Sequence, residues 1–78
     1  MKNSKTLSAL AVGEEGKVSF LFCDGSIRRR FLDVGLVPGT IVLCVGQSPL
    51  GDPKAYVIRG KTIAIRKSDA NKIIIAND

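Results

Sequence analysis

Apolar residues recur at every second position in several short segments of this chain, and this alternation predicts a protein built mainly from β-strands. In residues 17–23, Val18, Phe20 and Phe22 have this spacing and are expected on one face of a strand, with Ser19 on the other. Segments rich in β-branched residues predict further strands, at residues 41–46, 55–59, 62–67 and 73–76. We therefore expect five short strands.

One segment has the spacing of an amphipathic helix instead. Ile27, Phe31 and Val34 lie four and three residues apart and form one apolar stripe, while three consecutive arginines cover the other sides. Asp24 or Ser26 is expected to cap its first turn. Gly35 is expected to end it in the left-handed conformation, with Leu36 packing back on the last turn, as in a Schellman motif.

Turn residues separate the predicted elements. Pro38 and Gly39 fit the central positions of a type II turn, and Gly60-Lys61 has the glycine-first order of a type II′ hairpin turn. Pro49 and Pro53 mark a loop, because proline cannot donate to a strand ladder. Single helical turns are expected within residues 7–12 and 68–72, and the polar residues 1–6 are expected to be disordered.

Five strands in 78 residues must curl to cover both their edges and their apolar face. The fold class we expect is mainly β: a small SH3-like barrel, with the helix inserted between the first two strands and a helical turn before the last. The chain has no linker or repeat that would suggest a second domain, so residues 7–76 are expected to form one domain.

The net charge of +5 falls entirely in residues 26–78, which hold nine basic and four acidic residues. This asymmetry favours an acidic protein surface, a nucleic acid or an anionic membrane face as partner, or only a solubilising basic surface. The chain has no His and no Trp, and Cys23 and Cys44 lack the spacing of a zinc or redox site. We expect reduced, buried cysteines and no enzymatic activity.

No apolar segment approaches the length of a membrane span, and the short N-terminal apolar stretch is broken by Ser8. We therefore expect a cytoplasmic protein without a signal peptide.

Three segments, in order, carry a family resemblance. Residues 28–40 contain a basic residue, two apolar residues and then a small-x-Gly-apolar-x-Pro-Gly pattern, and the other two segments are residues 48–53 and residues 62–73. Together they resemble the FeoA family of small accessory proteins of ferrous iron transport. The likeness extends from about Leu7 to Ile75. It implies an SH3-like barrel that acts as a cytoplasmic accessory protein, and because the sequence lacks metal-ligand patterns no cofactor is expected. It also implies a partner, FeoB, a membrane transporter of ferrous iron with an N-terminal G-protein domain in the cytoplasm; the membrane would be reached only through that partner.

Arg28, Arg29 and Arg30 are candidates to dock on acidic groups of that G domain, although at most two can share one contact because helical neighbours point about 100° apart. An arginine acting on a transferring phosphoryl group and a merely solvated helix face are the alternatives. Leu50 and Asp52, both in the proline-braced loop, are further candidate contacts, with Leu50 at the tip of the loop as a contact for the partner or for another copy of the chain. The alternative for Leu50 is a leucine folded back to pin the loop.

Two other functions stay open on the sequence alone. Four basic residues lie near the final hairpin and could bind nucleic acid: Arg59, Lys61, Arg66 and Lys67. No aromatic residues accompany them, so nucleic-acid binding is not expected. FeoA domains also occur in metal-dependent repressors, which makes a metal-responsive regulatory domain the other alternative. The chain has no winged-helix segment. No metal site is expected either, because the candidate acidic residues are dispersed along the chain: Glu14, Glu15, Asp33, Asp52 and Asp69.

Overall fold

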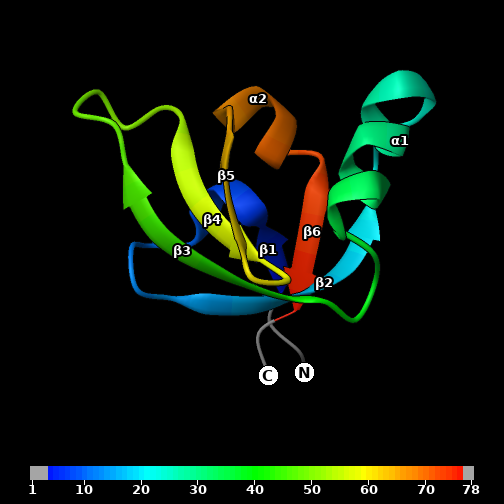
Figure 1. Ribbon diagram of the computed structural model, residues 1–78, viewed down its shortest axis with the longest axis horizontal. Coiled ribbons are helices and arrows are strands. Elements are labelled where there is room, and N and C mark those ends of the chain that lie inside the picture. The colour runs from blue at the N-terminus through cyan, green and yellow to red at the C-terminus, as the bar shows by residue number, and fades with distance from the viewer. Residues whose placement is uncertain (1–3, 77–78) are drawn as a thin grey trace.

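The computed structural model describes residues 4–76 and contains one six-stranded antiparallel sheet (Figure 1). Its strands are β1 (Ser4–Thr6), β2 (Glu15–Leu21), β3 (Ile41–Gln47), β4 (Lys54–Ile58), β5 (Lys61–Ile65) and β6 (Ile73–Ala76). A 3-10 helix, η1 (Leu7–Ala9), and two α-helices, α1 (Gly25–Val34) and α2 (Lys67–Ala70), connect them. The strand order is β1-β6-β2-β3-β4-β5, so β1 and β5 are the edges of the sheet.

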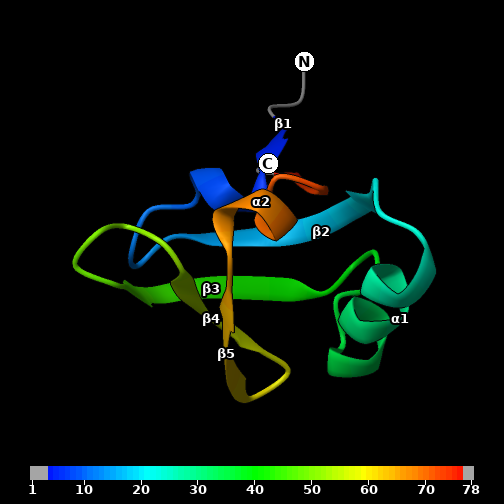
Figure 2. The same cartoon turned by 90° about the horizontal axis from the view of Figure 1, so that it is seen from above.

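The sheet is strongly curled around an apolar core (Figures 1 and 2). The largest fully buried side chains come from β2, β3, β4 and β6 and from the connecting segments: Leu7, Leu10, Val18, Leu36, Val42, Cys44, Tyr56, Ile58, Ile73 and Ile75. In both views α1 lies at one end of the molecule and the loop between β3 and β4 at the opposite end. The curl therefore separates two of the chain's most exposed segments.

The predicted end of the helix is confirmed. Gly35 has φ 104°, and the N–H of Leu36 donates to the Phe31 carbonyl at 2.9 Å, which is the long hydrogen bond of a Schellman motif. Leu36 is fully buried. At the other end Asp24 is the N-cap residue but makes no side-chain capping bond, and Ser26 lies within the helix.

The prediction that Val18, Phe20 and Phe22 share one face is wrong. The register of β2 with β6 shifts between Val18 and Phe20, so the alternation of faces is interrupted there. Val18 is buried, whereas Phe20 is 52% and Phe22 68% exposed, and Leu21 takes up the inward position. A β-bulge thus turns two aromatic rings to the surface.

Two further expectations need correction. The hairpin between β4 and β5 turns at Arg59-Gly60, where both φ angles are positive (52° and 86°) as a type I′ turn requires, and Lys61 already pairs with Ile58. Ser4–Thr6 form a sixth strand paired with β6, where disorder was expected; residues 1–3 lie outside the described part of the chain. The predicted turn at Pro38-Gly39 is present, with Gly39 at φ 98° and the Thr40 N–H donating to the Val37 carbonyl.

Within residues 4–76 no helix has the length and apolar character that crossing a bilayer requires.

Candidate interaction surfaces

The three arginines of α1 are all exposed and leave the helix in different directions. The helix buries Phe31 against the core, and Ile27 and Val34 pack beside it. Arg30 lines a cleft between α1 and β5. Because Arg28 precedes it by two residues, about 200° around the helix, Arg28 lies on the other flank. The structure therefore divides the arginine cluster between two surfaces.

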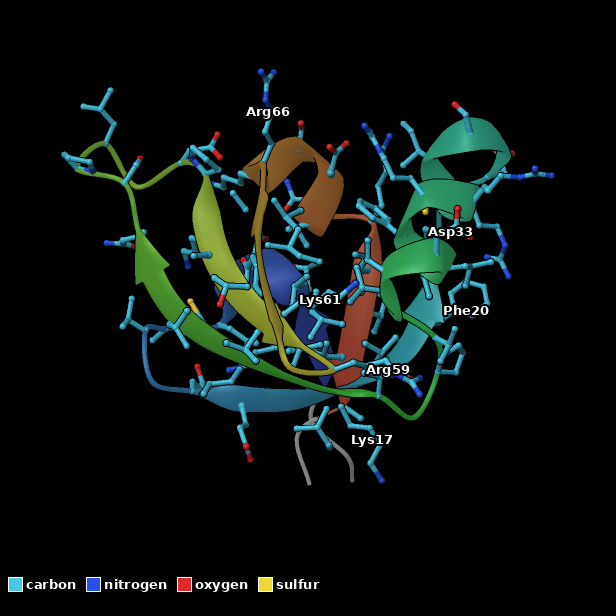
Figure 3. The ribbon with its side chains drawn as sticks, viewed as in Figure 1. Lys17, Phe20, Asp33, Arg59, Lys61 and Arg66 are labelled. Carbon is cyan, nitrogen blue, oxygen red and sulfur yellow. The ribbon has the colours of Figure 1, made fainter. Side chains whose placement is uncertain are left out.

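An exposed aromatic pair lies at the same end of the molecule as α1. The rings of Phe20 and Phe22 pack edge to face, with centroids 4.8 Å apart. Figure 3 shows Phe20 directed outward beside α1. We call Phe20, Phe22, Arg28 and Arg29 the helix-end surface. Sequence reasoning missed its two phenylalanines, because regular alternation placed both rings on the same face as Val18, which is buried.

Leu50 projects from the loop between β3 and β4 and is 94% exposed, so it is not folded back onto the barrel. The loop around it is held by polar contacts of its flanking residues. Ser48 Oγ accepts from the Asp52 N–H at 3.1 Å and donates to the Asp52 carbonyl at 2.7 Å. The Asp52 carboxylate accepts from the Lys67 N–H at 2.8 Å. Leu50 is thus presented on a braced loop, and Asp52 has a structural role.

The structure does not bring the two predicted contact regions together. Arg28, Arg29 and Arg30 lie on α1, and Leu50 and Asp52 lie in the loop at the other end of the long axis (Figures 1 and 2). That axis measures 33 Å. One partner could touch both regions only by extending along the whole molecule.

The remaining basic residues do not form one continuous patch. Arg59 and Lys61 line a cleft with Asp33 beneath the end of α1, whereas Arg66 lines the separate cleft that holds Arg30. Lys54 is used internally, because its ammonium donates to the carbonyls of Ser8 and Leu10, both at 2.8 Å. Figure 3 shows Arg66 pointing away from the body of the protein.

Two ionisable groups have displaced pKa values. A hydrogen bond from the Lys5 ammonium at 2.6 Å, helped by the Ala11 N–H, holds the pKa of Glu14 below its usual range. Burial raises the pKa of Tyr56 to about 12, and its hydroxyl donates to the Leu7 carbonyl at 3.3 Å. Tyr56 belongs to the packing of the barrel, whereas the Glu14 side chain stays 34% exposed.

Cys23 and Cys44 are free and buried, as expected from the apolar segments that hold them. Among residues 4–76 no group of three or more His, Cys, Asp or Glu side chains is placed to hold a metal ion. We therefore assign no metal site to this part of the chain.

Comparison with known proteins places the chain in a family. The FeoA domain profile matches residues 5–77. A Porphyromonas gingivalis fusion protein, described as Fe(2+) transport protein A joined to the Fe(2+) transporter FeoB, is 34% identical over 67 residues. That match covers 86% of this chain and 8% of the fusion protein, so the chain spans only a small part of that relative.

Solved structures agree in fold. A FeoA-like protein from Clostridium acetobutylicum matches with 31% identity and a TM-score of 0.85, covering 99% of this chain and 88% of that one. The zinc complex of Stenotrophomonas maltophilia FeoA, described as an SH3 domain protein, matches with 27% identity and a TM-score of 0.79, covering 90% and 87%. The SH3-like barrel expected from the sequence is confirmed, and the chain belongs to the FeoA family, which is linked to ferrous iron transport.

Proposed function

We propose that this chain is a non-enzymatic cytoplasmic accessory protein of ferrous iron uptake, which binds the G-protein domain of a FeoB-type transporter and modulates it. The observation that carries this proposal is the Porphyromonas gingivalis fusion protein, in which a related segment is covalently joined to FeoB. Fusion holds two modules at a high effective concentration, so it favours partners whose association is useful. A separate chain must achieve the same association through a binding surface.

The helix-end surface is the best candidate for that contact. Phe20 and Phe22 are each more than half exposed, and water contact with these apolar rings is unfavourable in the unbound chain. A partner that covers the rings removes this unfavourable free energy. Arginines beside an aromatic centre are typical of interface residues that carry much of the binding free energy. Arg28 and Arg29 would meet acidic groups of the partner around the aromatic pair. The loop between β3 and β4, which carries Leu50, lies at the opposite end of the barrel (Figure 1), so Leu50 then belongs to a separate contact.

Titration calorimetry with the isolated G domain of the transporter from the same organism tests this proposal. We expect Arg28→Glu and Phe22→Ser each to weaken binding roughly tenfold or more, as is usual for a central interface residue. Lys17→Glu is the matched charge-reversal control, because Lys17 is exposed and points away from α1 (Figure 3). It should bind like the unmodified chain. Unchanged binding of both helix-end variants would refute this surface, and no binding by the unmodified chain would refute the function.

A further inference from the structure

The strand β5 has a free edge. It is the last strand of the sheet and pairs only with β4, over the five residue pairs from Lys54↔Ile65 to Ile58↔Lys61. In a ladder closed by a two-residue turn, the pair next to the turn exchanges both hydrogen bonds, and such pairs then alternate with non-bonded pairs. Thr62 and Ala64 fall in the non-bonded pairs, so their N–H and C=O groups point away from β4. Both residues are exposed.

Nothing in the described part of the chain uses these groups. No backbone hydrogen bond outside the β4–β5 ladder involves Thr62 or Ala64. Proteins commonly protect an exposed edge with a bulge or a proline, and β5 has neither, because its ladder with β4 is regular throughout. The edge is therefore competent to pair with another strand.

A cleft of about 470 Å³ runs beside this edge. Its walls are β5, α1 and the start of α2, and it has apolar side chains from two sides: Phe31, Val34, Ile63 and Ile65. Strand residues point alternately to the two faces of a sheet. An added strand would therefore direct every second side chain into this apolar cleft and the others to solvent.

The charges around the cleft select the partner. Arg30 and Arg66 line it, with the Arg66 side chain pointing away from the body of the protein (Figure 3), and Asp69 is the single acidic residue that lines it. Within residues 4–76 the ion pair between Lys5 and Glu14 is the only one, so neither Arg30 nor Arg66 has a carboxylate partner there. Lys61 adds a further positive charge at the hairpin end of β5. Carboxylates of a bound segment would form ion pairs with Arg30 and Arg66.

We propose that the β5 edge binds an extended acidic segment of a partner protein, in which apolar and acidic residues alternate, by adding it as a seventh strand. Hydrogen bonds to the main-chain groups of Thr62 and Ala64 provide affinity that does not depend on the sequence of the bound segment. The apolar cleft and its arginines provide the preference for apolar and acidic side chains. This site is distinct from the helix-end surface and does not depend on the G-domain contact.

The test uses a synthetic, blocked eight-residue peptide of alternating glutamate and valine, followed by amide hydrogen exchange and chemical shifts of the labelled protein. We expect saturable binding, with the amides of Thr62 and Ala64 newly protected from exchange. Arg66→Glu should weaken binding roughly tenfold, since it replaces an attraction by a repulsion. Lys17→Glu should have no effect. A peptide with lysine in place of glutamate should bind at least tenfold more weakly.

Ala64→Pro separates strand addition from simple charge attraction. Proline removes an N–H that β4 does not use, and edge strands tolerate it there. We expect this variant to keep its fold but to lose peptide binding. If it does not fold, the exchange protection in the unmodified chain decides alone. No peptide binding at millimolar concentration, equal binding of the lysine peptide, or binding without protection of Thr62 and Ala64 would overturn the proposal. A dimer that forms through β5 would overturn it as well, because the occupant would then be a second copy.

Discussion

The Asp52 carboxylate accepts a hydrogen bond from the backbone N–H of Lys67 at 2.8 Å, and this contact ties the loop between β3 and β4 to the first residue of α2. The N-cap residue of α2, Arg66, offers no side-chain acceptor, so Asp52 satisfies an N–H that the helix leaves unpaired. Asp52, and not the exposed Leu50, thus anchors this loop to the barrel.

Replacing this anchor should lower the stability of the barrel. We expect Asp52→Ala to reduce the free energy of unfolding by about 1 kcal/mol, the usual cost of losing a helix-capping acceptor. Asp52→Asn keeps an oxygen at the same place and should lose less. Urea denaturation followed by circular dichroism measures both. Equal losses for the two variants would show that the hydrogen bond to Lys67 is not what stabilises the loop.

Gly35 and Gly39 both have positive φ angles, but their surroundings differ. A β-carbon at Gly35 would overlap the Arg59 side chain, with Cγ at 3.0 Å, whereas one at Gly39 would meet nothing within 4 Å. Both substitutions to alanine carry left-handed backbone strain of about 1 kcal/mol. Gly35→Ala should therefore be the more destabilising of the two in thermal unfolding.

Removing the Arg59 side chain checks the cause of that difference. In the double variant Gly35→Ala with Arg59→Ala, the overlap is absent, so the extra cost of alanine at position 35 should shrink to the value found for Gly39→Ala. An undiminished cost would mean that the contact with Arg59 does not determine it.

Tyr56 should make the protein sensitive to alkali. Its pKa is raised to about 12 in the folded chain from an ordinary value of 10.0, so the unfolded chain loses this proton first. The stability that depends on the neutral phenol is complete below pH 10 and decreases as the pH rises from 10 to 12. Because the pKa differs by two units between the folded and unfolded chain, the free energy of unfolding should fall by about 3 kcal/mol over this range.

Comparison with Tyr56→Phe isolates this contribution from that of the lysines and cysteines. The stability of the variant, measured in urea at successive pH values, should fall less between pH 10 and 12 than that of the unmodified chain. At neutral pH the variant should lose at most about 1 kcal/mol, because its only lost contact is the bond to the Leu7 carbonyl. Parallel curves for the two proteins would contradict the raised pKa.

Much of this fold could be predicted from local pattern. The stripe of Ile27, Phe31 and Val34 and the glycine that follows it specify α1 and its end without any tertiary information. The type I′ hairpin was missed because Arg59 adopts a positive φ that is unusual for a non-glycine residue. Ser4–Thr6 have no apolar periodicity, and they form a strand only because β6 offers them a partner.

The candidate surfaces were harder to predict than the fold. The exposure of the three arginines follows from their places on α1, but their division between two surfaces depends on where β5 lies. The aromatic pair became visible only through the bulge after Val18, because a one-residue shift of register exchanges the faces of a strand. No local sequence pattern predicts that Asp52 accepts a hydrogen bond from the first turn of a helix 15 residues away.

Phe22→Ser should weaken binding to the G domain while leaving the stability of the barrel nearly unchanged. Phe22 is 68% exposed, and its ring packs edge to face with the ring of Phe20. We expect the substitution to change the free energy of unfolding by less than about 1 kcal/mol, since few buried contacts are lost. Thermal unfolding measures this directly. A large loss of stability would mean that the aromatic pair serves the barrel, and would remove it from the proposed interface.

Chemical-shift mapping of the labelled chain with the unlabelled G domain tests the central claim most directly. The account predicts that the largest changes and line broadening fall on Phe20, Phe22, Arg28 and Arg29, with residues 48–53 at the opposite end unaffected. Changes confined to that loop, or spectra unaltered at saturating G domain, would contradict it.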